Sequence, residues 1–137
     1  MDDIITAAGA GGGPHVRAFS LAAGAITELA SFLAYAPLFT GGVNVAVGDV
    51  NGDGIEDIVT GAGAGAGPHL RVFSMAGGSP RESASFSAYD PAFTGGVFVA
   101  VGDVNDDGID DIIAGPGPGG PGHVRGFCFV MGGTLQP

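Results

Sequence analysis

The stretch from Val45 to Phe73, VAVGDVNGDGIEDIVTGAGAGAGPHLRVF, contains the patterns that decide the fold of this protein. It opens with apolar and small residues in alternation, the period of a half-buried β-strand. An acidic turn rich in Gly and Asn follows, and then a short apolar run. A Gly-rich and Pro-containing break separates that run from a further strand pattern, HLRVF. We therefore expect several short strands joined by tight turns.

The same pattern recurs along the chain at a fixed period. DVNGDGIEDI, which begins at Asp49, returns as DVNDDGIDDI, which begins at Asp103. A long fixed period predicts a solenoid, a propeller or an array. Each period holds four strand patterns and no convincing helical period, which is typical of a β-propeller blade. We expect an all-β protein of antiparallel four-stranded blades, with about 2.5 repeats per chain.

This period predicts a single repeat domain with three parts. Residues 1–40 should form a partial blade that lacks its first strand, residues 41–94 a full blade, and residues 95–137 a blade that lacks its last strand. Propellers close with about 4–8 blades, so these blades cannot close a ring alone. Unpaired sheet edges favour pairing with another chain, and we therefore expect a ring closed by oligomerisation, with the chain itself as partner.

Composition and charge exclude several classes of partner. The chain has 137 residues with a formal net charge of −10, which argues against binding to nucleic acid or to an anionic membrane. No apolar run approaches the roughly 20 residues of a membrane span. The opening MDDIITAAG does not have the basic start of a signal peptide. Cys128 is the only cysteine and is expected to be buried and inert.

The acidic turn is the strongest candidate for a functional site, because nine of the 14 acidic residues lie in its two copies. Oxygen-bearing side chains fall at positions 1, 3, 5 and 9 of each copy, and a Gly at position 6 permits a sharp turn. A backbone carbonyl at position 7 can add a further ligand, and such hard oxygen donors suit Ca²⁺. The predicted metal ligands are Asp49, Asn51, Asp53, the Ile55 carbonyl and Asp57 in the first copy, and Asp103, Asn105, Asp107, the Ile109 carbonyl and Asp111 in the second.

Two other interpretations of this turn were weighed. An EF-hand requires a bidentate Glu at position 12 between two helices, whereas this position is Thr60 or Ala114 and strands are expected on both sides. A solvated acidic turn without metal is the remaining alternative, since Asp, Asn and Gly are common turn residues. Two copies in register make that alternative the weaker one.

A His-x-Arg pair recurs with the same period and gives two alternatives. The pairs are His15 and Arg17, His69 and Arg71, and His123 and Arg125. Each pair shares one face of a strand with a Phe, so the rows could form a surface for a glycan or a carboxylate. The alternative is structural, with each Arg paired to an acidic or carbonyl group between blades. Tyr35 and Tyr89 lie at blade junctions and are expected to anchor packing.

The stretch from Val45 to Phe73 resembles an FG-GAP/VCBS-type repeat, the blade unit of integrin alpha-subunit propellers and of many bacterial secreted proteins. The resemblance implies that the acidic turn joins the first two strands of a blade and binds Ca²⁺. It carries over to the two ligand sets above, and in the first part of the chain only Asp3 matches, as the closing ligand of a partial metal site. It also implies an extracellular or cell-surface location.

These observations favour a calcium-binding propeller module that acts in adhesion, in ligand binding or as a scaffold, through homo-oligomeric assembly. Two alternatives stay open. One is a purely structural or engineered propeller fragment with no ligand beyond Ca²⁺, and the other is a lectin-like propeller that binds a glycan. An extracellular protein is a further partner to consider. No Ser-His-Asp or Cys-His arrangement recurs, so we do not expect an enzyme.

Overall fold

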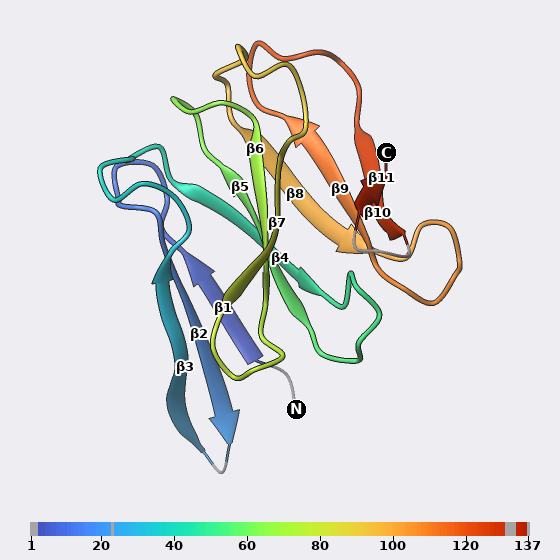
Figure 1. Ribbon diagram of the computed structural model, residues 1–137. Helices are drawn as coiled ribbons and strands as arrows, with labels where there is room; N and C mark the ends of the chain where they lie inside the picture. Colours follow the sequence, from blue (N-terminus) through green and yellow to red (C-terminus); the bar gives the residue numbers. More distant parts are fainter. Residues whose placement is uncertain (1–2, 23, 131–133, 137) are drawn as a thin grey trace.

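The computed structural model describes residues 3–22, 24–130 and 134–136, and every regular element in these ranges is a β-strand. The strands form three antiparallel sheets that follow one another along the chain (Figure 1). The first sheet contains β1 (Asp3–Ala7), β2 (His15–Ala22) and β3 (Ala25–Leu33). The second contains β4 (Val43–Gly48), β5 (Asp57–Ala62), β6 (His69–Ser74) and β7 (Arg81–Ser87). The third contains β8 (Val97–Gly102), β9 (Asp111–Pro116), β10 (Arg125–Val130) and β11 (Thr134–Gln136).

The second sheet is the complete repeat unit. Its strands pair in the order β4-β5-β6-β7, and the β4–β5 pairing runs from Val43 opposite Ala62 to Gly48 opposite Asp57. The alternation in β4 has the expected effect, because Val43 and Val45 pack against the first sheet. The acidic turn joins β4 to β5 at one end of the sheet. Four antiparallel strands per repeat are therefore confirmed for residues 41–94.

The third sheet corrects one expectation. Residues 95–137 were expected to lack a fourth strand, but β11 pairs with β10, from Cys128 opposite Gln136 to Val130 opposite Thr134. The prediction was wrong because such a short edge strand is held by backbone pairing. It therefore needs no alternating run of side chains that sequence patterns could reveal.

The first sheet has three strands, and its strand β1 occupies the place that β5 has in the second sheet. Asp3 pairs with Ser20 just as Asp57 pairs with Ser74, its counterpart in the next repeat. In the second sheet, β4 pairs with one edge of β5 and β6 with the other. In the described part of the chain, β2 pairs with one edge of β1 and no strand pairs with the other. The first sheet therefore presents an open edge.

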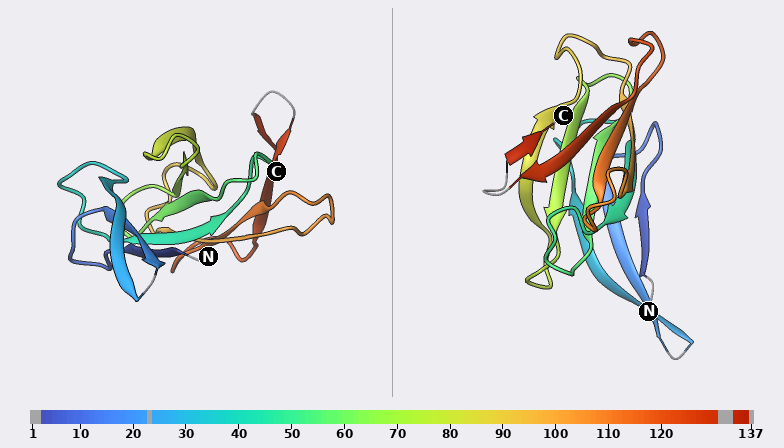
Figure 2. Two further views of the ribbon diagram at one scale, coloured as in Figure 1. Left: turned by 90° about the horizontal axis from the view of Figure 1, so that it is seen from below. Right: turned by 90° about the vertical axis from the view of Figure 1, so that its right-hand side faces the viewer.

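The sheets pack face to face around two apolar clusters. One cluster, which includes Val16 and Phe73, joins the first and second sheets, and the other, which includes Leu70 and Ile112, joins the second and third. The views in Figure 2 show the sheets arranged as a fan whose ends do not meet. The all-β prediction is thus confirmed, whereas ring closure stays a prediction. None of the described residues forms a helix long and apolar enough to cross a membrane.

Glycines permit the close approach of neighbouring sheets. A Cβ on Gly61 of β5 would lie 2.7 Å from the Val97 carbonyl oxygen of β8, in the next sheet. A Cβ on Gly48 of β4 would lie 2.4 Å from Val101 Cγ1 of the same strand β8. Contacts this short exclude any side chain larger than hydrogen. The abundance of Gly therefore reflects packing between sheets as well as turns.

Candidate metal centre

The first acidic turn, residues 49–57, is wound around the carboxylate of its first residue. Asp49 Oδ1 accepts hydrogen bonds from the backbone N–H groups of Gly52 and Asp53, at 2.8 and 3.1 Å, and Asp49 Oδ2 accepts one from Gly54 at 2.8 Å. Gly52 and Gly54 have φ values of 79° and 81°, which Gly adopts without strain. The turn therefore curls its backbone donors inward, toward the side chains that we predicted as ligands.

The next two predicted ligands are held in the same way. Asn51 Oδ1 accepts from the Asp53 N–H at 3.1 Å, and Asp53 Oδ1 accepts from the Ile55 N–H at 2.9 Å. These are Asx turns, in which a side-chain oxygen bonds a backbone donor two residues later. They orient successive side chains along one turn of the loop, and they offset part of the negative charge that the loop concentrates.

The closing residue, Asp57, differs from the others because it is fully buried. Its Oδ2 accepts a hydrogen bond from the Val50 N–H at 3.0 Å, which ties the end of the turn to its beginning. Burial, together with the charges of Asp53 and Asp49, raises the pKa of the Asp57 carboxyl to about 6. The folded protein therefore holds a carboxylate that a nearby cation would stabilise.

The second turn, residues 103–111, repeats this geometry. Asp103 Oδ2 accepts from the Gly108 N–H at 2.8 Å, and Asp107 Oδ1 accepts from the Ile109 N–H at 2.9 Å. Asp111 is buried, and its Oδ2 accepts from the Val104 N–H at 3.0 Å, as Asp57 does in the first turn. The backbone donors, that of Gly108 above all, lower the pKa of Asp103. Equivalent turns of two successive repeats thus share most of their bonds.

The two turns differ at two positions: Glu56 is replaced by Asp110, which keeps the charge, and the other difference affects the backbone. Gly52 of the first turn is replaced by Asp106, whose φ of 62° is the single positive value at a described residue other than Gly. Asp tolerates this left-handed conformation better than most residues do, but with more strain than Gly. Asp106 therefore keeps the turn geometry at a small cost in stability.

The donor chemistry of both turns fits a hard divalent cation, because each offers three carboxylates, one amide oxygen and one backbone carbonyl. The arrangement is less compact than a preformed cage. In the part of the chain that the structure describes, no three His, Cys, Asp or Glu side chains lie close enough together to hold a metal ion. The turn is ordered by its own backbone donors, and ion binding would draw its side chains further inward.

Asp3, the predicted ligand of a partial site, lies at the start of β1 and is exposed, whereas its counterparts Asp57 and Asp111 are buried. The described residues around Asp3 include no acidic turn like those that precede Asp57 and Asp111. The structure therefore places Asp3 where a closing ligand would stand, at the open edge of the first sheet.

The His-x-Arg rows contribute to the contacts between sheets. Arg71 donates to the Ala34 carbonyl at 2.8 Å and Arg125 donates to the Ala88 carbonyl at 2.7 Å, in each case across to the preceding sheet. Among the described residues no sheet precedes that of Arg17, which forms an ion pair with Glu28 of its own sheet. These bonds give Arg71 and Arg125 a structural role.

The histidines of these rows complete the same boundaries through their backbone. Tyr35 and Tyr89 donate their hydroxyl protons across the boundaries to the carbonyls of His69 and His123, both at 2.8 Å. The His69 and His15 rings hydrogen-bond Ser85 and Ser31 of the neighbouring strand. Tyr35 and Tyr89 are therefore the packing anchors that we predicted.

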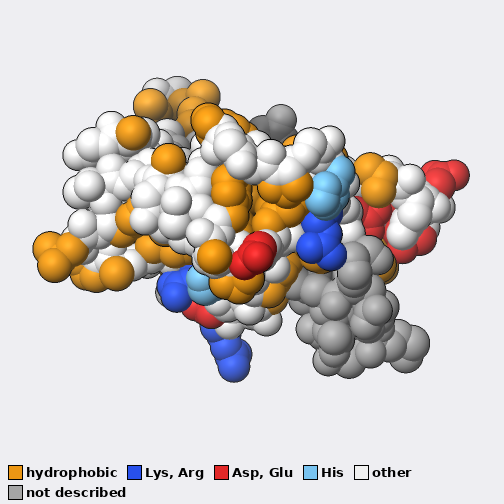
Figure 3. All heavy atoms as spheres, turned by 90° about the horizontal axis from the view of Figure 1, so that it is seen from above, with side chains coloured by type: hydrophobic (Ala, Val, Ile, Leu, Met, Phe, Trp, Pro, Cys, Tyr) orange, Lys and Arg blue, Asp and Glu red, His pale blue; other side chains and the backbone are white. Residues whose placement is uncertain are grey.

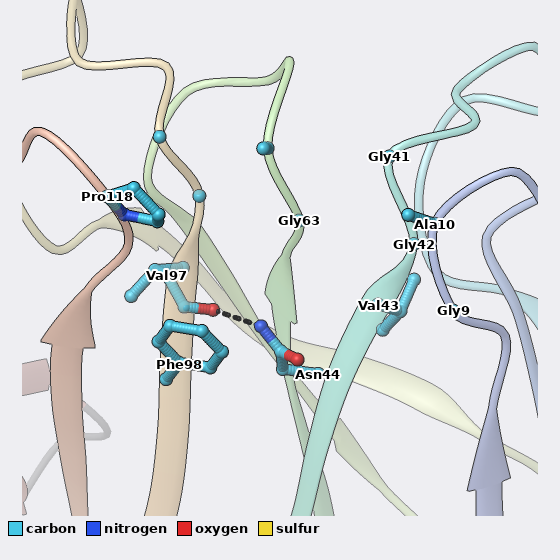
Figure 4. A pocket seen from close by; sticks show the side chains of 13 residues that line it. Gly9, Ala10, Gly41, Gly42, Val43, Asn44, Gly63, Val97, Phe98 and Pro118 are labelled. Carbon is cyan, nitrogen blue, oxygen red and sulfur yellow. Dashed lines mark hydrogen bonds between the residues drawn. The ribbon is translucent and has the colours of Figure 1, made fainter.

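A small pocket of about 260 Å³ lies near β4 and β8 and is lined by Gly and by other small or apolar residues (Figure 4). Asn44 and Phe98 reach into it, and Asn44 Nδ2 donates to the Val97 carbonyl at 2.8 Å across the sheet boundary. No charged side chain lines this pocket. Sequence reasoning did not find the Asn44 contact, because the repeat places Phe98 at the equivalent position.

The charged groups are concentrated elsewhere. Figure 3 shows the largest group of Asp and Glu side chains at one edge of the molecule, while hydrophobic side chains spread over much of the rest of that face. This distribution agrees with an acidity that belongs to the turns and not to the general surface. The acidic turns are therefore the strongest candidate site in the described structure.

Comparison with known proteins supports the repeat assignment. None of the curated proteins and none of the solved structures matches the chain. Residues 41–69 match the family model of the FG-GAP repeat, and this range covers β4, the first acidic turn and β5. Residues 41–69 are therefore similar to an FG-GAP repeat, in agreement with a β-propeller-like module of antiparallel sheets.

Proposed function

We propose that this protein is a calcium-binding, β-propeller-like module and that each complete acidic turn binds one Ca²⁺. The observation that carries the proposal is the buried closing carboxylate of each turn, Asp57 and Asp111, behind a loop of further oxygen donors. A buried carboxylate is costly unless it is paired or coordinates a metal. The fact that both turns share most of their bonds supports a common function.

In the first turn, five residues of the chain would coordinate the ion. Asp49, Asn51 and Asp53 would supply side-chain oxygens, Ile55 its carbonyl, and Asp57 the closing carboxylate. Their counterparts are Asp103, Asn105, Asp107, Ile109 and Asp111. The bound ion would supply positive charge to the carboxylates that crowd each turn. Because each turn connects two strands of one sheet, ion binding would also fasten those strands together.

We further propose that the module acts outside the cell or at its surface, as a binding, adhesion or scaffold domain without enzymatic activity, and that copies assemble with one another. The three sheets do not close, and each end of the fan exposes apolar side chains. Ile4 and Leu21 are exposed on the first sheet, and Val124 is exposed just before β10 of the third. Burial of such surface favours association. We expect the contacts between copies to involve residues 1–21 and 97–137.

Calorimetric titration with Ca²⁺ tests the metal proposal. The unaltered chain should bind two ions, and Asp53→Ala should bind one, because each turn carries its own set of ligands. Gly77→Ala is a suitable control, since a Cβ there meets nothing within 4 Å and Gly77 lies outside both turns. Unchanged stoichiometry in Asp53→Ala would mean that the turn is structural only. Sedimentation at micromolar concentration tests assembly, and a stable 13.3 kDa monomer would contradict it.

A further inference from the structure

The open edge of β1 adjoins a groove between the first and second sheets. The groove has a volume of about 460 Å³ and is lined by Asp3 and Ile5 of the first sheet and by Val47, Ile55 and Glu56 of the second, among others. It combines apolar walls with two carboxylates at the end where the acidic turns lie. The boundary between the second and third sheets shows what fills the equivalent space.

At that second boundary, the end of β4 and the first acidic turn lie against the third sheet. A Cβ on Gly48 would lie 2.4 Å from Val101 Cγ1 and 2.5 Å from Asp110 Oδ2, so these groups are in tight contact. The Asp110 N–H donates to the Asp49 carbonyl at 3.1 Å. A Cβ on Gly52 would lie 3.1 Å from Ile109 Cδ1. The Gly-Asp segment of the first turn thus contacts three residues of the third sheet, Val101, Ile109 and Asp110.

The counterparts of these three receiving residues, one repeat earlier, are Val47, Ile55 and Glu56, and all three line the groove. Two of them are less covered than at the second boundary: Ile55 is 41% exposed and Glu56 is exposed, whereas Ile109 and Asp110 are half-buried. The groove therefore exposes a surface whose equivalent at the second boundary is covered by a Gly-Asp turn.

We propose that the open edge of β1 and this groove form an acceptor site for a strand and acidic turn of the repeat's own type. The incoming segment would have the chemistry of residues 42–56, with Val at alternate positions followed by Gly-Asp-x-Asn-x-Asp-Gly. It would pair with β1 as β4 pairs with β5, and its Gly-Asp turn would rest on Val47, Ile55 and Glu56. Strand addition of this kind supplies main-chain hydrogen bonds for affinity and alternate side chains for specificity.

Asp3 has a defined place in this arrangement. It would stand next to the incoming turn as Asp57 stands next to the first turn, as the closing carboxylate of a third oxygen site. This part of the inference rests on the proposed calcium function. The pairing of the strand with β1 does not, because its backbone bonds and apolar contacts need no ion.

Binding of a synthetic peptide with the sequence of residues 42–56, GVNVAVGDVNGDGIE, to the full chain tests the proposal. Fluorescence anisotropy of the labelled peptide should show saturable binding in EDTA. A control peptide with Gly48→Val should bind about tenfold more weakly or not at all, because the added side chain would collide in the groove. Val also raises the β-propensity and hydrophobicity of the peptide. A β1 edge that bound any extended apolar peptide without a defined fit would therefore bind the control peptide better. Equal or stronger binding of the control, or no binding of either peptide, overturns the proposal.

The register of pairing can be tested in a Cys128→Ser chain. Thr60 is opposite Val45 in the second sheet, so Thr6→Cys in the chain should form a disulfide with a Val45→Cys peptide and not with an Ala46→Cys peptide. Equal cross-linking of both peptides would overturn the proposed pairing. Calcium should then tighten peptide binding to the unaltered chain, and Asp3→Asn should remove that gain. If binding persists in EDTA but calcium has no effect on it, the third oxygen site at Asp3 fails while the acceptor site stands; the titration of the two complete turns tests the calcium proposal separately.

Discussion

The packing of neighbouring sheets can be measured with one substitution made at two equivalent positions. Gly61 of β5 and Gly115 of β9 are counterparts in successive repeats and occupy the same point of their sheets. A Cβ on Gly61 would lie 2.7 Å from the Val97 carbonyl oxygen, whereas a Cβ on Gly115 meets nothing within 4 Å. The intrinsic effect of replacing Gly by Ala in a strand is the same at both positions. The difference between Gly61→Ala and Gly115→Ala therefore reports the contact between sheets.

The expected magnitude follows from the geometry. Ordinary contact begins at 3.4 Å, so Gly61→Ala requires the neighbouring strand to move by several tenths of an ångström. Overpacking of this kind costs about 1–3 kcal/mol. Such a movement also disturbs the hydrogen bond from Asn44 to the Val97 carbonyl, which is worth about 1 kcal/mol. Gly115→Ala should be neutral or stabilising by about 0.4–1 kcal/mol, since Ala restricts the unfolded chain.

Urea denaturation followed by circular dichroism, with calcium held constant, measures both variants. We expect Gly61→Ala to lower the free energy of unfolding by about 2–4 kcal/mol relative to Gly115→Ala. Equal effects would refute the packing of β5 against β8. If copies of the chain cover the third sheet, Gly115→Ala should weaken assembly without lowering the stability of the monomer, which sedimentation would reveal.

Four further outcomes are expected. Tyr89→Phe leaves the Ala114 and His123 carbonyls without their hydroxyl donor and should cost about 1–3 kcal/mol in urea denaturation, so an unchanged midpoint would contradict its anchoring role. Asp106→Gly removes a left-handed residue other than Gly and should raise the melting temperature in EDTA, so a lower melting temperature would mean that no strain is relieved. The pKa of Asp57 is about 6 in the folded state and about 4 in the unfolded state, so the folded state binds more protons between these pH values. The free energy of unfolding in EDTA should therefore fall as pH rises from about 4 to 6. A flat profile, or a slope that persists in Asp57→Asn, would argue against this. Calcium at roughly a hundred times its dissociation constant should add about 2.7 kcal/mol per site, so equal melting temperatures with and without EDTA would weigh against binding to the folded state.

Local patterns predicted much of the fold. The repeat period, the alternation from Val43 to Val47 and the breaks at Gly and Pro fixed the strands of the second sheet, because each depends on neighbours in the sequence. The bonds within the acidic turns are local for the same reason. Patterns could not reveal β11, because a run of three residues is too short to show an alternation.

Contacts between sheets were the part that the sequence could not resolve. The repeat of Arg71 and Arg125 was visible, but a choice between a ligand surface and an inter-sheet bond needed the positions of the Ala34 and Ala88 carbonyls. The contact of Gly48 with Asp110 was hidden for the same reason, since its partners are far apart in the sequence and lie on either side of a sheet boundary. Such contacts depend on how sheets pack, which the strand period does not encode.

The most direct test of the central claim is a diffraction measurement on crystals of the chain grown with Ca²⁺, recorded at a wavelength where calcium scatters anomalously. If both turns bind Ca²⁺, each complete turn should show one anomalous peak. One should lie among the oxygens of Asp49, Asn51, Asp53, Ile55 and Asp57, at about 2.3–2.6 Å, and the other among their counterparts. Absence of a peak from both turns at saturating calcium, with the turns ordered, would contradict the claim that these turns are calcium sites.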